Sequence, residues 1–277
     1  MLTQDKVIGI FCFVDDLLKA LGHKEPLNRK MSDSEVITTS LVGALYFGGH
    51  IENARGFMKE MGLVPGMLDK SRFNRRLHGV AGLIINLFEQ TGHLLKSISG
   101  AREYIIDSFP VAVCDNIRIS RSKILIGKKW RGRQSSMCRY FYGVRVQVLV
   151  TDNGIPVEFC FVPGSENDVK ALHKLPLEVA AESKIYADAA YTDYTIEDTL
   201  REAELVELMV QRKSNSKRKD PPWIDFVKGR MRKNIETVFS QLKSLFLRKI
   251  HAVTVQGFLL KIALFIIAFT FNKLIAT

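Results

Sequence analysis

The sequence is poor in cysteine, and the spacing of the few it has excludes the common zinc modules. Four of its 277 residues are cysteines (Cys12, Cys114, Cys138 and Cys160), and no two form a C-x-x-C pair. The six histidines are scattered without ligand spacing, so the chain carries no zinc-finger or zinc-ribbon pattern. We expect the cysteines to be small buried apolar residues in a reducing compartment.

We also expect no signal peptide, and the chain has no long uninterrupted apolar run. The first residues show no basic stretch ahead of a compact apolar core. The most apolar stretch, residues 257–276, is interrupted by Lys261, Asn272 and Lys273, which leaves 262–271 as its longest uncharged part. A run this short is more typical of a buried helix than of a membrane span. We therefore expect no membrane partner, and a protein anchored by residues 257–276 is the alternative.

Acidic residues are absent between Asp115 and Asp152, in a chain whose formal net charge is +11. A net positive charge favours a polyanionic partner, with nucleic acid first and an anionic membrane surface second. Cations with an interleaved aromatic ring suit phosphate contact and base stacking. We predict that this segment contacts DNA, the alternative being a solvated loop. The candidate contacts are Lys128, Lys129, Trp130, Arg131, Arg133 and Arg139.

What the sequence does contain is an ordinary globular composition, 47% hydrophobic and 25% charged, which excludes a disordered chain. Residues 1–98 show helical periodicity, and Ser32 to Glu35 has the S-x-x-E form of a capping box. We predict a helical N-terminal DNA-binding region here. Its candidate contacts lie on the second of a pair of helices. This helix is either part of a helix-turn-helix reader or a basic helix packed on the domain that follows. The candidate contacts are Arg72, Asn74, Arg75 and Arg76.

Beyond a junction near residues 97–100, the pattern changes to strands, and we place a second domain at 99–277. Strands are expected at 104–113, 142–150 and 155–162, a helix at 168–181, a strand at 184–187, a helix at 195–204 and a strand at 206–211. A hairpin followed by crossover units gives a five-stranded mixed sheet flanked by helices, an α/β fold with the layout of ribonuclease H. That layout sets Asp107 and Asp188 on neighbouring parallel strands.

Three acidic residues are the candidate catalytic groups. Asp107 lies within an apolar run, Asp188 ends a second one, and Glu236 lies in a basic amphipathic stretch. At 100° per residue, Arg232, Glu236 and Lys243 form a stripe beside the apolar face of one helix. If the acids converge, they would hold hard divalent cations beside a phosphodiester.

Each of these acids also has a structural interpretation. Asp107 suits an edge strand or turn, Asp188 a helix N-cap, and Glu236 a solvated pair with Arg232. We expect Asp168 to cap or begin the helix that follows it.

Several motifs resemble the small bacterial insertion-sequence transposases with a DDE catalytic domain, over nearly the whole chain. Arg232-x3-Glu236-x6-Lys243 resembles most of that family's Y-x2-R-x3-E-x6-K signature, with Gly229 where the tyrosine is expected. The segment 187–191 resembles the D-x-G-Y motif, with Ala190 in place of glycine. Residues 105–108, 139–146 and 154–157 resemble the first-aspartate strand and its hairpin, and 71–77 resembles part of the helical region that precedes the catalytic domain.

The resemblance implies a mechanism. Asp107, Asp188 and Glu236 would bind two Mg²⁺ or Mn²⁺ ions, cleave double-stranded DNA at the terminal inverted repeats, and join the 3′-hydroxyl to target DNA. Arg232 and Lys243 would hold phosphates near the scissile bond. A homodimer would pair two ends, in the bacterial cytoplasm and at the nucleoid when DNA-bound. The alternatives are a metal-dependent nuclease of the same fold and a catalytically silent DNA-binding derivative.

Overall fold

The structure is a computed structural model that describes residues 2–98, 100–134, 138–246 and 250–275. Its contacts divide the chain into two compact units, Met1–Gln90 with Leu242–Thr277, and Thr91–Gln241. The C-terminal residues thus belong to the same compact unit as the N-terminal helices. The assignment of a DNA-binding region to 1–98 and a catalytic domain to 99–277 stays a prediction, and residue 99 lies outside the described residues.

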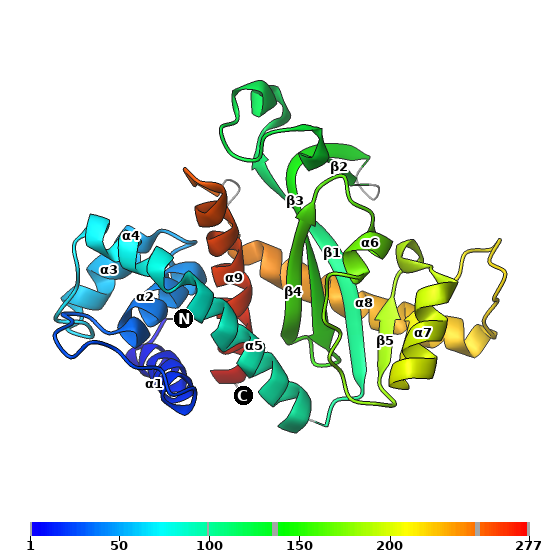
Figure 1. Ribbon diagram of the computed structural model, residues 1–277, viewed down its shortest axis with the longest axis horizontal. Coiled ribbons are helices and arrows are strands. Elements are labelled where there is room, and N and C mark those ends of the chain that lie inside the picture. The colour runs from blue at the N-terminus through cyan, green and yellow to red at the C-terminus, as the bar shows by residue number, and fades with distance from the viewer. Residues whose placement is uncertain (1, 99, 135–137, 247–249, 276–277) are drawn as a thin grey trace. The chain divides into compact units, whose positions relative to one another are not determined.

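The first unit is helical, and one of its helices packs against four others. It contains α1 (Gln4–Ala20), α2 (Asp33–Tyr46), α3 (Ile51–Glu60), α4 (Lys70–Gly79), the beginning of α5 (Ala81–Ile98) and α9 (Val255–Ile275). The helix α2 packs against α1, α3, α4 and α9, as the blue, cyan and red ribbons of Figure 1 show. The predicted capping box is confirmed, because Ser32 Oγ accepts from Glu35 N and Glu35 Oε2 from Ser32 N.

The helix α9 is apolar on almost every side. By length and composition it could cross a membrane. In this structure, however, an almost continuous run of its residues from Phe258 to Phe271 is buried within the helical unit, which is the pattern of a core helix. The prediction of a buried helix is confirmed for its described part, and residue 276 lies outside the described residues.

The second unit is built on a mixed sheet of six strands. They are β1 (Glu103–Cys114), β2 (Arg131–Gln134), β3 (Arg139–Thr151), β4 (Pro156–Pro163), β5 (Lys184–Ala187) and β6 (Glu207–Val210). The order is β2-β3-β1-β5-β6, and β4 also pairs with β3. Because β2 and β4 pair with successive parts of β3, the sheet has the predicted width of five positions. The additional strand β2 comes from the basic segment, where no strand was expected.

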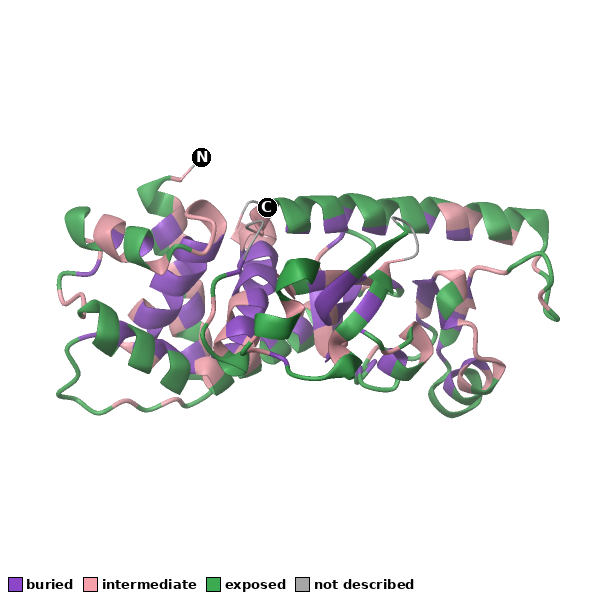
Figure 2. Cartoon of the chain, turned by 90° about the horizontal axis from the view of Figure 1, so that it is seen from above, coloured by how far each residue is buried: buried purple, intermediate pink, exposed green. Residues whose placement is uncertain are grey.

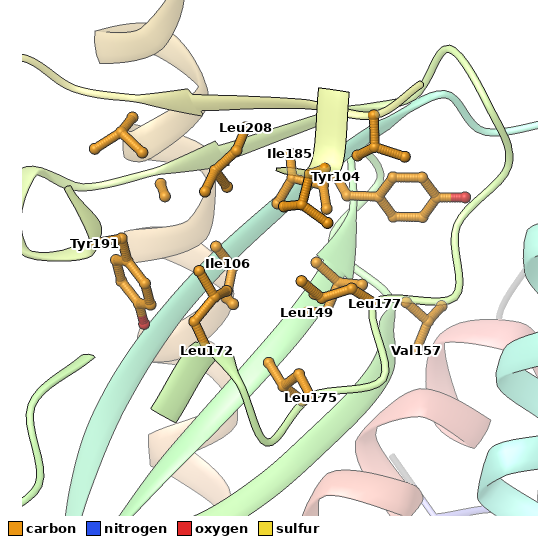
Figure 3. Close-up of a cluster of buried hydrophobic side chains, with 14 residues drawn as sticks. Tyr104, Ile106, Leu149, Val157, Leu172, Leu175, Leu177, Ile185, Tyr191 and Leu208 are labelled. Atoms are coloured by element: carbon orange, nitrogen blue, oxygen red, sulfur yellow. The ribbon is translucent and has the colours of Figure 1, made fainter. Parts of the chain in front are cut away.

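Side chains along β1 alternate between the two faces of the sheet. In β1, Tyr104 and Ile106 point into a core with Leu149, Leu172 and Ile185 (Figure 3). Alternation sends Ile105, Asp107 and Phe109 to the other face, where the ring of Phe109 meets that of Phe239 at 5.1 Å. That face is covered by α8 (Pro222–Leu245), whose predicted apolar residues Ile235, Val238 and Phe239 are buried. The other side of α8 is exposed (Figure 2).

Two sequence-based predictions are wrong. The helix expected at 168–181 ends at Leu172, as α6 (Asp168–Leu172). Pro176 cannot extend a helix, Leu177 takes a positive φ of 52°, and the backbone N–H groups of Leu177 and Glu178 donate to the Glu158 carboxylate. The expected burial of the cysteines also fails, since Cys12 and Cys138 are exposed.

Candidate active site

Asp107 and Asp188 are brought together by the parallel pairing of β1 with β5. The ladder aligns Tyr104 with Ile185 and Ile105 with Tyr186. Two residues further along both strands the same register sets Asp107 opposite Asp188, and alternation places both on the α8 face. Asp188 lies just past the end of β5, where its side chain also accepts from Ala190 N at 2.7 Å and caps the short helix η4 (Ala189–Tyr191). The predicted neighbourhood of these two acids is confirmed.

The two carboxylates line a small cavity together with Lys228, Arg232 and Ile235 of α8. The pKa of Asp107 is raised to about 7, first by burial and then by the negative charges of Asp188 and Asp168, whereas the Ser108 N–H and Arg232 lower it. Burial likewise raises the pKa of Asp188. Carboxylates that are costly to ionise together are suited to a site where a cation neutralises them.

Glu236 lies one residue beyond the lining of this cavity. Its side chain is 61% exposed, and its Oε1 lies 3.4 Å from Nε of Arg232. Arg232 also donates from Nη1 to Gln211 Oε1 at 3.1 Å, so it links the end of β6 to the third acid. The structure therefore brings Asp107, Asp188 and Arg232 to one cavity. It leaves Glu236 at the rim, in the ion pair that its structural interpretation had anticipated.

Lys243 follows Glu236 by seven residues on α8 and is exposed. Two helical turns separate them, so both residues lie on the same side of the helix. The predicted stripe of Arg232, Glu236 and Lys243 is therefore present on the exposed side of α8.

Lys228 is a member of the site that sequence reasoning missed. It is buried, its Nζ donates to the Val210 carbonyl at 2.9 Å, and it pairs with Asp220. The only signal available from the sequence was its spacing, one helical turn before Arg232.

Asp168 was expected to act only at the start of a helix, and its carboxylate does more. It accepts from Ser108 Oγ at 2.8 Å, from Arg145 Nη1 at 3.1 Å and from Gln147 Nε2 at 3.0 Å. Gln147 is fully buried and accepts from the hydroxyl of Tyr191. This network lies on the sheet face opposite Asp107. It holds Ser108, the residue after Asp107, by the hydrogen bond from Ser108 Oγ to Asp168. The sequence held no signal for it, because its members come from separate elements.

The basic segment runs through η1 (Asn116–Arg121), η2 (Lys128–Trp130) and β2, and Figure 1 shows it extending beyond the end of the sheet. Lys128, Lys129, Arg131, Arg133 and Arg139 are all exposed. The Nζ of Lys129 stands 5.1 Å from the Trp130 ring centroid, and Arg133 stands 5.9 Å from that of Tyr140. Arg131, Arg133 and Tyr140 line an open cleft of about 900 Å³ that reaches Asp168.

The four predicted DNA contacts on α4 have different surroundings. Arg76 is directed inward, where it pairs with Asp33 and donates to the Met31 carbonyl. Arg72 forms an exposed ion pair with Asp69, and Arg75 is exposed. Asn74 lines a groove of the helical unit. Arg76 is thus a structural residue in this arrangement.

Among the described residues, the group of ligand-type side chains close enough to share one ion is His23, Glu25 and Asp33, in the helical unit. The Asp33 carboxylate already lies 3.0 Å from Nη1 of Arg29 and 3.0 Å from Nε2 of His23, and it forms an ion pair with Arg76. Two guanidinium groups at this carboxylate make an ion-pair network that favours α2 packing, and they oppose a bound cation.

A comparison with known protein families matches residues 97–252 to a family described as transposase DDE domain. The match spans more than half of the chain and includes Asp107, Asp188 and Glu236. No curated protein and no solved structure matches the chain. With the acids on the α8 face of a ribonuclease-H-like sheet, the match establishes that the chain belongs to the transposases with a DDE domain.

Proposed function

We propose that this transposase cleaves DNA at the ends of an insertion sequence and joins the freed 3′-hydroxyl to target DNA at the Asp107–Asp188 cavity. The observation that carries the proposal is that both carboxylates line one cavity together with Arg232 of α8. The family acts on DNA as its substrate, and the formal net charge of +11 suits that polyanion.

Asp107 and Asp188 are the residues that would hold divalent cations, Mg²⁺ or Mn²⁺, with Glu236 completing the set. Bound cations of this kind activate the attacking oxygen and stabilise the leaving oxygen of a phosphodiester. The raised pKa of Asp107 fits this role, because the buried carboxylate gains most when a cation offsets its charge.

Glu236 and Arg232 would exchange partners when DNA binds. Their ion pair of 3.4 Å is exposed and therefore weak, on the order of 0.5 kcal/mol. Rotation of the Glu236 side chain toward the aspartates would release the Arg232 guanidinium to clamp a DNA phosphate. Lys243, on the same side of α8, would hold a second phosphate.

The basic segment would guide the DNA toward these acids. Lys128, Lys129, Arg131, Arg133 and Arg139 supply charge for backbone phosphates, and Trp130 and Tyr140 supply faces for an unpaired base. Two copies of the chain would hold the two ends of the element, and the work would take place in the bacterial cytoplasm, at the nucleoid.

The test is a cleavage assay on a duplex carrying an element end, beside a strand-transfer assay on a pre-cut end, both with and without a chelator. Asp107→Asn, Asp188→Asn and Glu236→Gln should each abolish both products while DNA binding changes less than about twofold. Asp225→Asn, at an exposed position in the first turn of α8, is the matched control and should stay active. Normal cleavage by Asp188→Asn would remove the proposed site.

The same assays separate the alternatives. Cleavage by the wild-type protein without any joined product from a pre-cut end would identify a nuclease. Binding without either product, in Mg²⁺ and in Mn²⁺, would identify a catalytically silent derivative.

A further inference from the structure

The helical unit contains a groove of about 420 Å³ whose lining differs from the predicted contact surface of α4. Lys70, Asn74 and His78 line it from α4. These residues are spaced by four and therefore form one stripe on the helix. All three are exposed. Arg72 lies on roughly the opposite side of α4, and Arg76 is engaged with Asp33. Asn74 is the one residue shared by the groove and the predicted contacts.

The facing wall of the groove comes from the beginning of α9 and the segment before it. It includes His251, Thr254, Gly257 and Lys261. The α9 backbone comes close to α4 here, since a Cβ at Gly257 would lie 3.3 Å from Cε1 of His78. Lys261 is half-buried and its Nζ donates to the His251 carbonyl. A cation held against this wall is fixed in direction, which lowers the entropy lost when it meets an anion.

The groove is lined by two lysines and by ring N–H donors. Besides Lys70 and Lys261, three histidines line it: His50, His78 and His251. The acidic side chain in the lining is Glu52, whose Oε2 already accepts from Arg55 at 2.7 Å. The first turn of α3 adds backbone N–H groups, because its N-cap His50 makes no side-chain cap. The groove therefore attracts an anion from three elements at once.

We propose that this groove binds the phosphate backbone of duplex DNA, with Lys70 and His78 as the outer contacts and Lys261 as the inner one. The inference deepens the proposed function, on which it rests, by assigning the DNA contact of the helical unit to the Lys70–Asn74–His78 stripe. The occupant is DNA, the substrate of this transposase, and Asn74 can donate to a phosphate or meet a base edge between Lys70 and His78.

The experiment titrates a labelled random-sequence duplex with the full-length protein at several salt concentrations. Lys70→Ala and His78→Ala should each weaken binding roughly fivefold, and Lys70→Ala should reduce the slope of log K against log salt by about one. Lys70→Arg should restore binding. Lys59→Ala is the matched control: it removes the same charge from an exposed position of α3 outside the groove and should leave affinity within about twofold.

Binding of Lys70→Ala that equals wild type, in affinity and in salt slope, would overturn the assignment. It would also be overturned if Lys70→Ala weakened the binding of inorganic phosphate but left DNA binding unchanged, since the groove would then be a small-anion site. Lys261→Met, which keeps the buried stem, should weaken DNA binding without a change in melting temperature. These outcomes are independent of catalysis: if the groove fails while Asp107→Asn still abolishes cleavage, the proposed function stands.

Discussion

At the scale of single residues, the chemistry of the site depends on how Asp107 is surrounded. Asp107 lines a cavity together with Asp188 and Ile235, and burial is the first cause of its pKa of about 7. Among the nearby charges, Asp188 and Asp168 raise the pKa, while Arg232 lowers it. A carboxyl with a pKa near neutrality is only partly ionised at pH 7, and a bound divalent cation would favour its ionised form.

Because the pKa of Asp107 is raised in the folded protein, its contribution to stability falls as the pH rises. The folded pKa of about 7 lies above the ordinary value of 3.8, so between those values the folded chain keeps a proton that the unfolded chain has lost. The contribution to stability is complete below pH 3.8 and is lost as the pH rises through about 7. Asp107→Asn, which cannot ionise, should therefore gain stability relative to wild type as the pH rises from 4 to 8, by roughly 4 kcal/mol at most.

Urea denaturation in a chelator at several pH values measures this gain. Asp225→Asn, on the exposed side of α8, should show no such trend. A pH-independent difference between Asp107→Asn and wild type would show that Asp107 ionises normally in the folded protein.

Two neighbours of Asp107 should shift its pKa in opposite directions. Asp168→Asn removes a negative charge and should lower the pKa of Asp107, whereas Arg232→Met removes a positive charge and should raise it. In both variants it should stay above 3.8, because burial is the first cause. Carbon-detected NMR of the labelled side-chain carboxyl reports the direction. Shifts of the same sign in both variants would contradict the arrangement of charges described here.

At the scale of elements, the helices and strands that could be predicted are those marked by a pattern within their own residues. Alternation along 142–150 and 155–162 predicted β3 and β4, and the apolar runs that hold Asp107 and Asp188 predicted β1 and β5. From the order of these elements the proximity of the two aspartates could be inferred. The end of α6 could not, because the Glu158 carboxylate that receives the backbone N–H groups of Leu177 and Glu178 comes from a distant strand. The rim position of Glu236 likewise depends on the rotamer of its ion pair with Arg232.

A buried ion pair joins α5 to β4. Lys96 Nζ lies 2.8 Å from Glu158 Oε1, with side chains 7% and 8% exposed, and Glu158 also holds the turn at Leu177. Lys96→Met should destabilise the protein by roughly 3 kcal/mol, because it leaves a buried carboxylate without its cation. The double variant Lys96→Met with Glu158→Gln should recover part of the loss, since the amide needs no counter-charge.

A double-mutant cycle by urea denaturation measures this coupling. Lys174→Met removes an exposed partner of Glu166 and is the control, with an expected change below about 1 kcal/mol. Additive losses in the Lys96 and Glu158 variants would show that the two side chains do not interact.

At the scale of the whole molecule, the chain returns to its first unit after completing its second. Residues 242–277 belong to the same compact unit as the N-terminal helices, and α9 packs on α1 and α2. A boundary at residue 98, taken from the change of pattern, separates α9 from these partners. The sequence gives no sign of the return, because hydrophobic periodicity shows that a helix is buried and does not show against what.

This return predicts which fragments fold. A fragment of residues 99–277 carries α9 without α1 and α2, so the side chains from Phe258 to Phe271 that are buried in the whole chain would face water, and we expect aggregation and strong binding of a hydrophobic dye. A fragment of residues 91–246 keeps the sheet, Lys96 and all of α8 without α9, and should be soluble, with a cooperative thermal transition. Circular dichroism, dye fluorescence and sedimentation of the two fragments provide the measurement. A monomeric 99–277 fragment that binds no dye would mean that α9 finds its cover within the second unit, and the division of the chain at Leu242 would then be wrong.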